Sequence, residues 1–438
     1  MAALDAFLAR IEERSARIGV VGLGYVGLPL AIAFAERGFA VLGLDVDAAK
    51  PDAIAAGRSY LRHIPAERFA GHVESGRLAA TTDFARAAEC DALIICVPTP
   101  LTDSREPDTR FIEQTARELA PRLRAGMLLA LESTTYPGTT DELLRALLEQ
   151  GSGLTAGSDF YLVYSPERED PGNADFHTAN IPKVVGGLSP DCQRAGQALY
   201  AAAVDQVVAV SSTRTAEMVK LFENIYRAVN IALVNELKLL CERLDMDVWE
   251  VIRAAATKPF GFQAFWPGPG LGGHCIPIDP FYLTWKARQV DLSTRFIELA
   301  GEINTAMPYH VIDRVSAGLN RQHKALNGSS VLVLGVAYKP DVDDMRESPA
   351  LKIISLLAER GARVLYHDPH VAHLAPSRKY HFDLKSSPLT ADLLEAVDCV
   401  LVVTHHRDVD YALVAEHAAL VVDTRNAVPA GRAEIVSA

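Results

Sequence analysis

The loop "GPGLGGHCIPIDP", residues 268–280, surrounds one cysteine with glycines and prolines. Cys275 can act as a nucleophile only as a thiolate, which requires positive charge or aligned backbone amides nearby. Taken alone, it fits a small buried apolar residue better than a nucleophile. A metal site is disfavoured because His274 is its direct neighbour and no matching pair of ligands lies nearby. Asp279 is a candidate for a base that holds water and equally for a helix cap.

Two polar side chains in the segment "VKLFENIYRAVNIALVNEL" form a second chemical candidate. Lys220 and Asn224 are four residues apart, which is about one helical turn. Apolar residues recur at helical spacing through this segment and predict one long helix of about 30 residues. Lys220 and Asn224 stand opposite that apolar stripe, so their types alone favour a polar face covered by water. The stripe consists of residues 218, 222, 225, 229, 233, 237 and 240.

The stretch "VVGLGYVG" places Gly22, Gly24 and Gly27 in a G-x-G-x-x-G pattern between an apolar strand and a helix. In dinucleotide-binding folds these glycines allow a tight turn, close approach of a pyrophosphate and close helix–strand packing. The helix N-terminus then faces the phosphates. Asp45 ends the following strand, where a carboxylate accepts hydrogen bonds from ribose hydroxyls and repels a 2'-phosphate. These residues predict NAD as the cofactor.

Buried strands must position these residues. Apolar runs such as "DALIICVPTP", "GMLLALESTTYP" and "DFYLVYSPERED" alternate with helical patterns and predict a doubly wound parallel sheet. The same pattern restarts at "SVLVLGVAYKP", after the polar stretch "NRQHKALNGSS". We therefore expect two Rossmann-like α/β domains joined by a helical central domain with the long helix. The expected boundaries are residues 1–210 for the NAD-binding domain, 211–322 for the helical domain and 323–438 for the second α/β domain.

The composition excludes several other classes of protein. The 438 residues are 49% hydrophobic and 22% charged, as in globular proteins, and exceed what one ordinary core accommodates. The formal net charge of -12 argues against nucleic acid or an anionic membrane as a partner. The six scattered cysteines contain no C-x-x-C pair and form neither a disulfide framework nor a zinc pattern. No signal peptide or apolar run of about 18 residues is evident, so we expect a cytoplasmic protein.

Seven motifs, in their order along the chain, resemble the UDP-glucose/GDP-mannose dehydrogenase family. They are "GLGYVGLPLA", "CVPTP", "ESTTYPGTT", "YSPERE", "VKLFENIYRAVNIALVNEL", "GPGLGGHCIPIDP" and "GVAYKPDVDDMRESPA". The resemblance is greatest to the branch that oxidises UDP-N-acetylglucosamine or UDP-N-acetylmannosamine to the 6-carboxylate. It implies a homodimer or higher homo-oligomer that makes precursors of surface polysaccharides.

The resemblance also implies a four-electron oxidation, in which the C6 alcohol becomes a carboxylate and two NAD⁺ are reduced. Cys275 would add to the intermediate aldehyde as a thiohemiacetal, and a second oxidation would give a thioester that water hydrolyses. Lys220 and Asn224 would stabilise negative charge on the sugar oxygen. Asp279 would act as a base together with a bound water.

Further residues of the matched motifs would contact the substrate or the cofactor. Glu167 would act as acid and base in hydrolysis, and Thr134 would position the attacking water. Arg346 would contact NAD, although pairing with Asp343 or Asp344 to hold its own loop is an alternative. The implied cofactor contacts are Gly22, Gly24, Tyr25, Val26, Gly27, Asp45, Pro98, Thr99, Thr134 and Arg346. The implied substrate contacts are Glu167, Arg168, Lys220, Asn224, Gly270, Gly272, Tyr338, Lys339 and Arg425.

One position departs from the family pattern. Members that oxidise UDP-glucose carry an arginine upstream of the cysteine, which contacts the sugar from a neighbouring subunit. The run here is "KPFGFQAF", with Phe260 near that place. A 2-acetamido group tolerates an aromatic neighbour better than a hydroxyl does, so we expect a UDP-N-acetylhexosamine, first UDP-N-acetylglucosamine, with UDP-N-acetylmannosamine or UDP-glucose as alternatives. A two-electron hydroxyacid dehydrogenase and a catalytically silent nucleotide-sugar sensor are the competing hypotheses.

Overall fold

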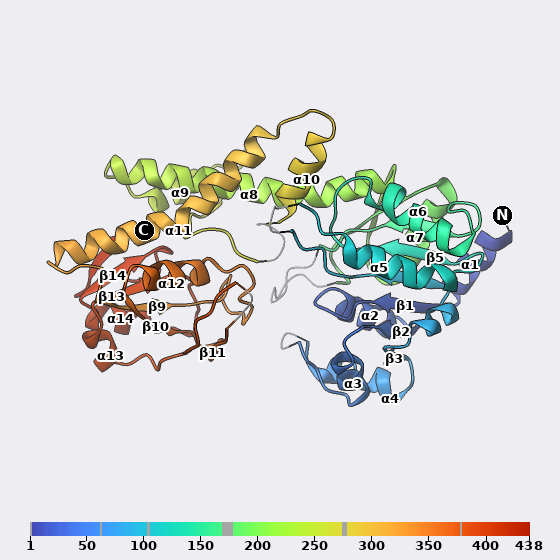
Figure 1. The fold of residues 1–438 in the computed structure, drawn as a ribbon, viewed down its shortest axis with the longest axis horizontal. Coiled ribbons are helices and arrows are strands. Elements are labelled where there is room, and N and C mark those ends of the chain that lie inside the picture. The colour runs from blue at the N-terminus through green and yellow to red at the C-terminus, as the bar shows by residue number, and fades with distance from the viewer. Residues whose placement is uncertain (1, 62–63, 103–105, 169–177, 274–277, 377–378) are drawn as a thin grey trace. The chain divides into compact units, whose positions relative to one another are not determined.

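The computed structural model describes residues 2–438 apart from 62–63, 103–105, 169–177, 274–277 and 377–378. The chain forms two compact units, whose elements are labelled in Figure 1. The N-terminal unit comprises Met1–Glu223 with Trp285–Leu292, and the C-terminal unit comprises Asn224–Thr284 with Ser293–Ala438. Each unit contains its own sheet and its own hydrophobic core.

The sheet of the N-terminal unit has eight strands in the order β3-β2-β1-β4-β5-β6-β7-β8. Neighbouring strands are parallel except for β6 and β7, which are antiparallel. The order from β3 to β6 is that of dinucleotide-binding folds, in which ligands bind beyond the carboxyl ends of the strands. The strands are β1 (Arg17–Val21), β2 (Ala40–Leu44), β3 (Leu78–Thr81), β4 (Ala92–Ile95), β5 (Leu128–Leu131), β6 (Tyr161–Tyr164), β7 (Lys183–Gly187) and β8 (Val207–Val210). The predicted doubly wound sheet is confirmed, but its apolar runs do not reveal the reversed direction of β7.

Helices cover both faces of this sheet, which explains why its central strands consist of continuous apolar runs. One face shares a core with α1 (Ala2–Glu12), α2 (Gly27–Glu36) and α7 (Pro190–Ala201). The other face shares a core with α5 (Arg110–Leu119) and α6 (Arg145–Ser152). Shorter helical segments complete the unit: α3 (Ala49–Ala55), η1 (Ala66–Arg68), α4 (Ala70–Glu74), η2 (Phe84–Glu89), η3 (Ala120–Arg122) and η4 (Thr139–Leu144).

The C-terminal unit contains a parallel sheet of five strands in the order β10-β9-β13-β14-β15. α11 (Arg295–Arg321) and α12 (Pro349–Glu359) pack on one face, and α13 (Ala391–Ala396) and α14 (Tyr411–His417) pack on the other. The second α/β unit predicted from "SVLVLGVAYKP" is therefore confirmed. The remaining elements of the C-terminal unit are β9 (Ser330–Leu334), β10 (Arg363–His367), β11 (His373–Leu374), β12 (Leu384–Lys385), β13 (Cys399–Val402), β14 (Leu420–Asp423), β15 (Glu434–Ser437) and α9 (Val248–Ala255). α10 (Asp279–Arg288) begins in this unit, and its residues from Trp285 onward belong to the N-terminal unit. Among the helices that the structure describes, none is long and apolar enough to cross a membrane.

The long helix predicted from apolar spacing is α8 (Thr213–Arg243). The expectation that water covers its polar face is wrong, because Lys220 and Asn224 are each only 6% exposed. Phe222 and Leu233 of the apolar stripe are 66% and 60% exposed. Helical spacing identifies the two faces of a helix, but it does not show which face the rest of the chain covers. The polar residues buried on α8 are Thr213, Glu217, Lys220, Asn224, Asn235 and Lys238.

The carboxylate of Glu217 attaches the first turns of α8 to the segment that follows β5. Glu217 is fully buried, and its Oε2 accepts a hydrogen bond from the Gly138 N–H at 2.7 Å. Its Oε1 accepts bonds from the N–H and the hydroxyl of Thr140 at 2.9 and 2.7 Å. These donors lie at the start of a helical segment, where a negative charge is favoured. The three bonds hold α8 at one rotation about its axis.

We predict that Glu217 makes the stability of this unit depend on pH. Burial raises the pKa of Glu217 from 4.5 to about 7, although the bonds from Thr140 and Gly138 oppose the rise. Because the folded pKa is the higher one, protonation stabilises the folded state fully below about pH 4.5, and this contribution of up to about 3 kcal/mol is lost as the pH rises through about 7. Glu217→Gln should remove this dependence. Thermal unfolding at several pH values should show the wild type exceeding the variant most at low pH.

The control for this prediction is Glu118→Gln, which removes an exposed carboxylate of α5. Its unfolding temperature should follow that of the wild type at every pH. A gap between the wild type and Glu217→Gln that widens with rising pH would contradict the assignment.

Candidate active site

The glycine turn between β1 and α2 leaves room for a ligand at one of its three glycines. Gly22 has a φ of 91°, and a Cβ there would lie 2.5 Å from the Cys96 carbonyl oxygen. A Cβ at Gly27 would lie 1.8 Å from the Gly22 oxygen. A Cβ at Gly24 would meet no described protein atom within 4 Å. Protein packing thus explains Gly22 and Gly27, whereas the open space at Gly24, before a helix N-terminus, fits a pyrophosphate.

Asp45 follows β2 directly and binds the glycine turn. Its Oδ2 accepts a hydrogen bond from the Leu23 N–H at 2.7 Å, and its Oδ1 accepts one from the Asp47 N–H at 3.0 Å. Lys50 Nζ lies 2.8 Å from the same Oδ2, and the Tyr60 hydroxyl donates to the Leu23 carbonyl at 2.6 Å. The carboxylate predicted to meet the ribose therefore also fixes the turn. Sequence reasoning missed Lys50 and Tyr60, because the glycine pattern does not include them.

The loops after β4 and β5 are joined to each other beyond the carboxyl ends of these strands. The Thr99 hydroxyl donates to the Thr134 carbonyl at 2.6 Å. The Ser133 hydroxyl accepts a bond from the Val97 N–H at 3.0 Å and donates to the Val97 carbonyl at 2.7 Å. The structure thus brings Pro98, Thr99 and Thr134 to the edge where the glycine turn lies. Their contacts with NAD, and the placement of water by Thr134, stay predictions.

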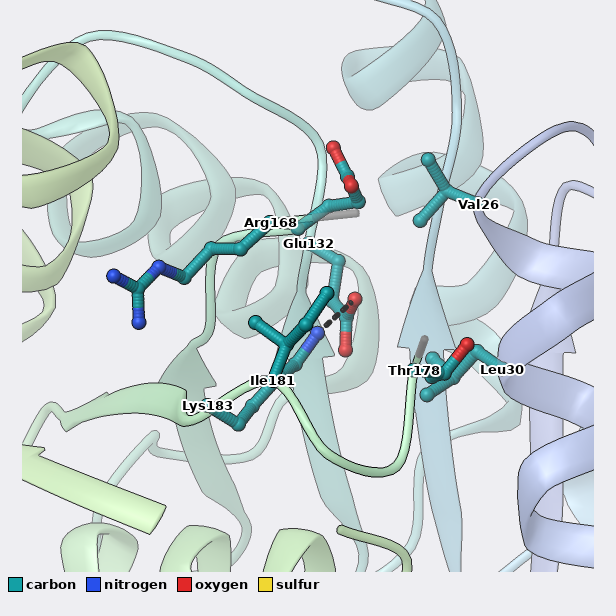
Figure 2. A pocket seen from close by; sticks show the side chains of 8 residues that line it. Val26, Leu30, Glu132, Arg168, Thr178, Ile181 and Lys183 are labelled. Carbon is teal, nitrogen blue, oxygen red and sulfur yellow. Dashed lines mark hydrogen bonds and ion pairs between the residues drawn. The ribbon is translucent and has the colours of Figure 1, made fainter. Parts of the chain in front are cut away.

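A small cavity gathers residues from three motifs, as Figure 2 shows. Its volume is about 20 Å³, which is enough for about one water molecule. Glu132, directly after β5, and Lys183, the first residue of β7, form a buried ion pair across 2.7 Å. Val26 of the glycine turn and Glu167 and Arg168 of "YSPERE" complete the lining, together with Leu30, Thr178 and Ile181. One predicted cofactor residue and two predicted substrate residues therefore border one space, beside an ion pair that sequence reasoning missed.

Glu167 and Arg168 each contact α8. Lys220 Nζ lies 3.4 Å from Glu167 Oε2, and both side chains are largely buried. The Arg168 guanidinium points away from the buried ion pair of the cavity (Figure 2) and donates to Glu223 Oε1 and to the Pro182 carbonyl, both at 2.6 Å. The structure thus brings together Glu167 and Lys220, two residues predicted for catalysis. Charges act strongly on one another in such a poorly solvated place.

Asn224 lies one turn after Lys220 on α8 and contacts the first residue of α10. Its Nδ2 donates to Asp279 Oδ2 at 2.5 Å, and both side chains are buried. An amide that donates to a carboxylate fixes the orientation of that carboxylate. The Lys220–Glu167 and Asn224–Asp279 pairs therefore start from adjacent turns of the buried face of α8.

Cys275 lies outside the described residues, so its predicted role is not tested by geometry. The loop that leads to it is anchored by α8, because the Gly268 N–H donates to Asn235 Oδ1 at 2.9 Å. A Cβ at Gly272 would come 2.8 Å from the Tyr338 Cβ, so Tyr338 packs directly on this loop. The predicted substrate residues Tyr338 and Gly272 are thus neighbours within the C-terminal unit.

Arg425 lies two residues after the end of β14. Within the described part of the chain, its guanidinium forms no ion pair with a carboxylate. Its Nε donates to the Val403 carbonyl at 2.8 Å, and burial lowers the pKa of its guanidinium to about 10. A Cβ at Gly268 would lie 2.5 Å from Arg425 Nη1, so the glycine loop passes against the guanidinium. The nearby Asp423 carboxylate opposes this lowering only in part, and a cation removed from water in this way favours an anionic ligand such as a diphosphate.

Two other predicted residues of the C-terminal unit occupy the loop between β9 and α12. Lys339 Nζ lies 5.8 Å from the centre of the Tyr338 ring. Arg346 donates to Asp344 through Nη2 at 2.6 Å and through Nε at 2.9 Å. Of the two alternatives for Arg346, the pairing within its own loop is therefore observed, and its contact with NAD stays a prediction.

Three stretches of the sequence match the domains of one protein family. Residues 16–204 match the NAD binding domain of the UDP-glucose/GDP-mannose dehydrogenase family, residues 214–306 its central domain and residues 332–430 its UDP binding domain. A UDP-N-acetyl-D-mannosamine dehydrogenase of Yersinia pestis is 37% identical over 402 residues, which cover 89% of this chain and 93% of the relative. The chain belongs to the UDP-glucose/GDP-mannose dehydrogenase family.

Two further proteins resemble this family member closely. An NDP-N-acetyl-D-galactosaminuronic acid dehydrogenase of Ralstonia nicotianae is 36% identical over 398 residues, covering 89% of this chain and 91% of the relative. A solved structure of a UDP-D-ManNAc dehydrogenase from Pyrococcus horikoshii superposes with a TM-score of 0.86 at 32% identity, covering 96% of this chain and 98% of that one. The predictions of family, fold class, NAD as cofactor and a UDP-sugar dehydrogenase activity are thereby confirmed.

We predict that the dehydrogenase needs Gly24 for its cofactor and Gly27 for its fold. Gly24→Ala should unfold at the wild-type temperature, because its methyl group meets no protein atom, and should bind NAD⁺ roughly tenfold or more weakly, since overpacking costs about 1–3 kcal/mol. Gly27→Ala is the matched control and should lower the unfolding temperature itself. Calorimetric titration with NAD⁺ and thermal unfolding measure the two effects. Wild-type NAD⁺ affinity in Gly24→Ala would refute the placement of the pyrophosphate.

Proposed function

We propose that this dehydrogenase oxidises the C6 alcohol of a UDP-N-acetylhexosamine to the carboxylate in two successive oxidations. The observation that carries the proposal is the pairing of Lys220 with Glu167 and of Asn224 with Asp279 from adjacent turns of α8. A dehydrogenase that stopped at the aldehyde would need a single proton acceptor. Two carboxylates, each paired with a polar residue of α8, together with the cysteine of the family motif, fit a reaction that also forms and hydrolyses an acyl intermediate.

The residues divide the chemistry among themselves. When NAD⁺ is bound, it accepts the hydride that leaves C6 in each oxidation. Asp279, oriented by Asn224, removes the proton of the C6 hydroxyl through a water, and the Lys220 ammonium stabilises the charge that develops on the oxygen. The Cys275 thiolate adds to the aldehyde, and the thioester formed after the second oxidation is hydrolysed with Glu167 transferring protons. The net reaction consumes one alcohol, one water and two NAD⁺, and it yields one carboxylate, two NADH and three protons.

A UDP-linked 2-acetamido sugar is the substrate that we favour. The relatives described above are named for N-acetylmannosamine and N-acetylgalactosaminuronic acid, which are both 2-acetamido sugars. The sequence does not settle the C2 epimer, with UDP-N-acetylglucosamine as its first choice, whereas two of these three names are for N-acetylmannosamine, so UDP-N-acetylmannosamine becomes the first candidate. Arg425 and the UDP binding domain support a diphosphate linkage. A role in the synthesis of surface polysaccharide precursors follows from the same resemblance and is part of this proposal.

The exposed apolar stripe of α8 supports assembly into a homodimer or a higher homo-oligomer. Within the C-terminal unit, Leu233 and Leu240 are more than half exposed on α8, and Phe296 is 79% exposed on α11. Large apolar side chains exposed along a helix, as Leu233 and Leu240 are, are typical of a protein–protein interface. Phe260 is 72% exposed as well, which suits a residue that takes part in contacts between subunits. A monomer in light scattering would contradict this assembly. The division into an NAD-binding domain (1–210), a helical central domain (211–322) and a UDP-sugar-binding domain (323–438) is also part of this proposal.

We predict that the purified protein forms two NADH for each UDP-N-acetylhexosamine consumed. The value of kcat/KM should be highest for UDP-N-acetylmannosamine or UDP-N-acetylglucosamine and lower for UDP-glucose. NADH absorbance, together with mass analysis of the sugar product, measures the stoichiometry and the ranking. One NADH per sugar would indicate a two-electron dehydrogenase, and none would indicate a nucleotide-sugar sensor. A higher kcat/KM for UDP-glucose would refute the preference for a 2-acetamido sugar.

We predict that Cys275→Ser stops the enzyme between its two oxidations. Serine is a poorer nucleophile at neutral pH and a poorer leaving group than a thiolate, so formation and hydrolysis of the acyl intermediate should slow by roughly a hundredfold or more. A single-turnover experiment should show the first NADH, followed by a trapped ester or released aldehyde. Cys399→Ser, which changes a buried cysteine of β13, is the matched control and should leave the reaction unchanged. Normal release of acid by Cys275→Ser would exclude the thioester mechanism.

A further inference from the structure

The loop that follows β9 is tied down on both sides of Tyr338 and Lys339. Before these residues, the Val336 N–H donates to Asp368 Oδ2 at 2.7 Å, and the Thr404 hydroxyl donates to the Ala337 carbonyl at 2.6 Å. After them, the Asp341 N–H donates to His406 Nδ1 at 3.0 Å. The intervening residues Tyr338–Pro340 lie between these two fixed points, and the Tyr338 N–H donates to the Asp344 carbonyl at 2.9 Å. All of these residues belong to the C-terminal unit.

His406 connects the two fixed points. It is fully buried, and its Nε2 lies 3.1 Å from Asp368 Oδ2, the same oxygen that holds the Val336 N–H. Burial alone would raise the pKa of Asp368, but the bonds from His406 and from backbone N–H groups bring it below its usual value, so this carboxylate is ionised. Asp368, His406 and the loop therefore form a closed ring of hydrogen bonds around Tyr338–Pro340.

The partners of His406 define its tautomer and its charge. Because a backbone N–H points at Nδ1, that nitrogen must carry a lone pair and no proton. The proton therefore sits on Nε2 and is donated to the Asp368 carboxylate. His406 is a neutral imidazole in this arrangement.

A metal ion is the alternative for this cluster. Ligand atoms of Asp341, His370 and His406 lie within 4.8 Å of one another. However, both ring nitrogens of His406 already take part in hydrogen bonds, and Arg407 Nε donates to Asp341 Oδ2 at 2.6 Å. A metal ion would have to break at least one of these bonds, so the observed contacts favour a hydrogen-bonded network.

We propose that His406 is a positioning residue for the nucleotide sugar, which in its neutral form holds the loop of Tyr338 and Lys339 in the conformation that binds substrate. The proposal rests on the proposed function and on the contacts with the UDP-sugar that the family resemblance implies for Tyr338 and Lys339. A loop held in its bound conformation binds more tightly because less conformational entropy is lost on binding.

The same network bears on the loop that leads to Cys275. A Cβ at Gly273 would lie 3.0 Å from the Tyr338 ring, and the Gly273 N–H donates to the Arg346 carbonyl at 3.0 Å. Displacing Tyr338 would therefore release a contact of the glycine loop as well as a contact of the nucleotide. We expect the loss of His406 to raise KM more than it lowers kcat.

Acid should weaken this arrangement. A proton added to Nδ1 would turn an acceptor into a donor that faces the Asp341 N–H. The groups around the ring that carry or can carry charge are Asp341, Asp368, His370, Tyr411 and Arg407. The Asp368 carboxylate would stabilise a positive charge on the His406 ring, but it cannot replace the hydrogen bond between the Asp341 N–H and His406 Nδ1.

Two substitutions distinguish the hydrogen bond at Nδ1 of His406 from the one at Nε2. In His406→Asn the side-chain oxygen can take the place of Nδ1 and keep the bond from Asp341, whereas in His406→Gln the amide nitrogen can take the place of Nε2 and keep the bond to Asp368. We expect binding of UDP-N-acetylmannosamine without NAD⁺ to stay within about twofold in His406→Asn and to weaken about tenfold in His406→Gln, as for one lost hydrogen bond. His405→Gln changes the exposed neighbouring histidine and should match the wild type.

Calorimetric titration and hydrogen exchange provide independent readouts. The Asp341 amide should exchange slowly in the wild type and in His406→Asn, and faster in His406→Gln. When the pH is lowered from about 8 to about 5.5, the wild type should lose affinity for the sugar nucleotide, and His406→Asn should not.

Each result decides the proposal. Equal weakening in the two variants, or the same pH dependence in the wild type and His406→Asn, overturns it. Should His406→Gln fail to fold, the comparison of pH dependence between the wild type and His406→Asn still decides. An affinity that rises with added Zn²⁺ in the wild type alone would assign the cluster to a metal and overturn the proposal. A wild type that binds no UDP-sugar contradicts the proposed function itself, whereas binding that His406 does not influence contradicts only this inference.

Discussion

A charged side chain removed from water must find a partner, and the buried face of α8 meets this requirement with polar groups from other segments of the chain. Its buried face carries Glu217, Lys220 and Asn224 over little more than two turns. Glu217 is satisfied by Thr140 and Gly138, and this sets the rotation of the helix. The same rotation brings Lys220 to Glu167. The contacts that fix the rotation of α8 therefore also fix the position of Lys220 relative to Glu167. A change at Glu217 would alter both the rotation of the helix and the Lys220–Glu167 contact.

At the predicted cofactor site, too, one side chain has both a structural and a ligand-binding role. Asp45 holds the Leu23 N–H within the glycine turn while it stands at the strand end where a ribose is expected. The Lys50 ammonium forms an ion pair with the Asp45 carboxylate, so this buried negative charge is compensated without a ligand. A turn that is already ordered loses little entropy when it binds a pyrophosphate, which favours affinity.

Much of this architecture could be predicted from the sequence, because glycine spacing and continuous apolar runs report directly on backbone geometry and on burial. Gly22, Gly24 and Gly27 were recognisable because few residues other than glycine suit a tight turn or a close contact. The exposure of Phe222 and the burial of Lys220 could not be predicted from the sequence, since they depend on which other segments pack on α8. Glu132, Lys183 and His406 carry no local signal either, because each acquires its role from a partner far away in the chain. Cys275 remains an inference from its motif, as its position lies outside the described residues.

The reversed direction of β7 has a consequence for the chemistry of the sheet. In a purely parallel sheet only the ends of strands and the loops after them reach the ligand edge, so charged groups there sit on loops. Because β7 runs antiparallel to β6, its first residue, Lys183, reaches that edge while it remains within the ladder with β8, where it pairs with Val207. A cation supplied in this way is held by ladder hydrogen bonds, so its backbone moves less than a loop would allow. The inverted strand thus supplies a positive charge with a fixed backbone to the cavity that Glu167 also lines.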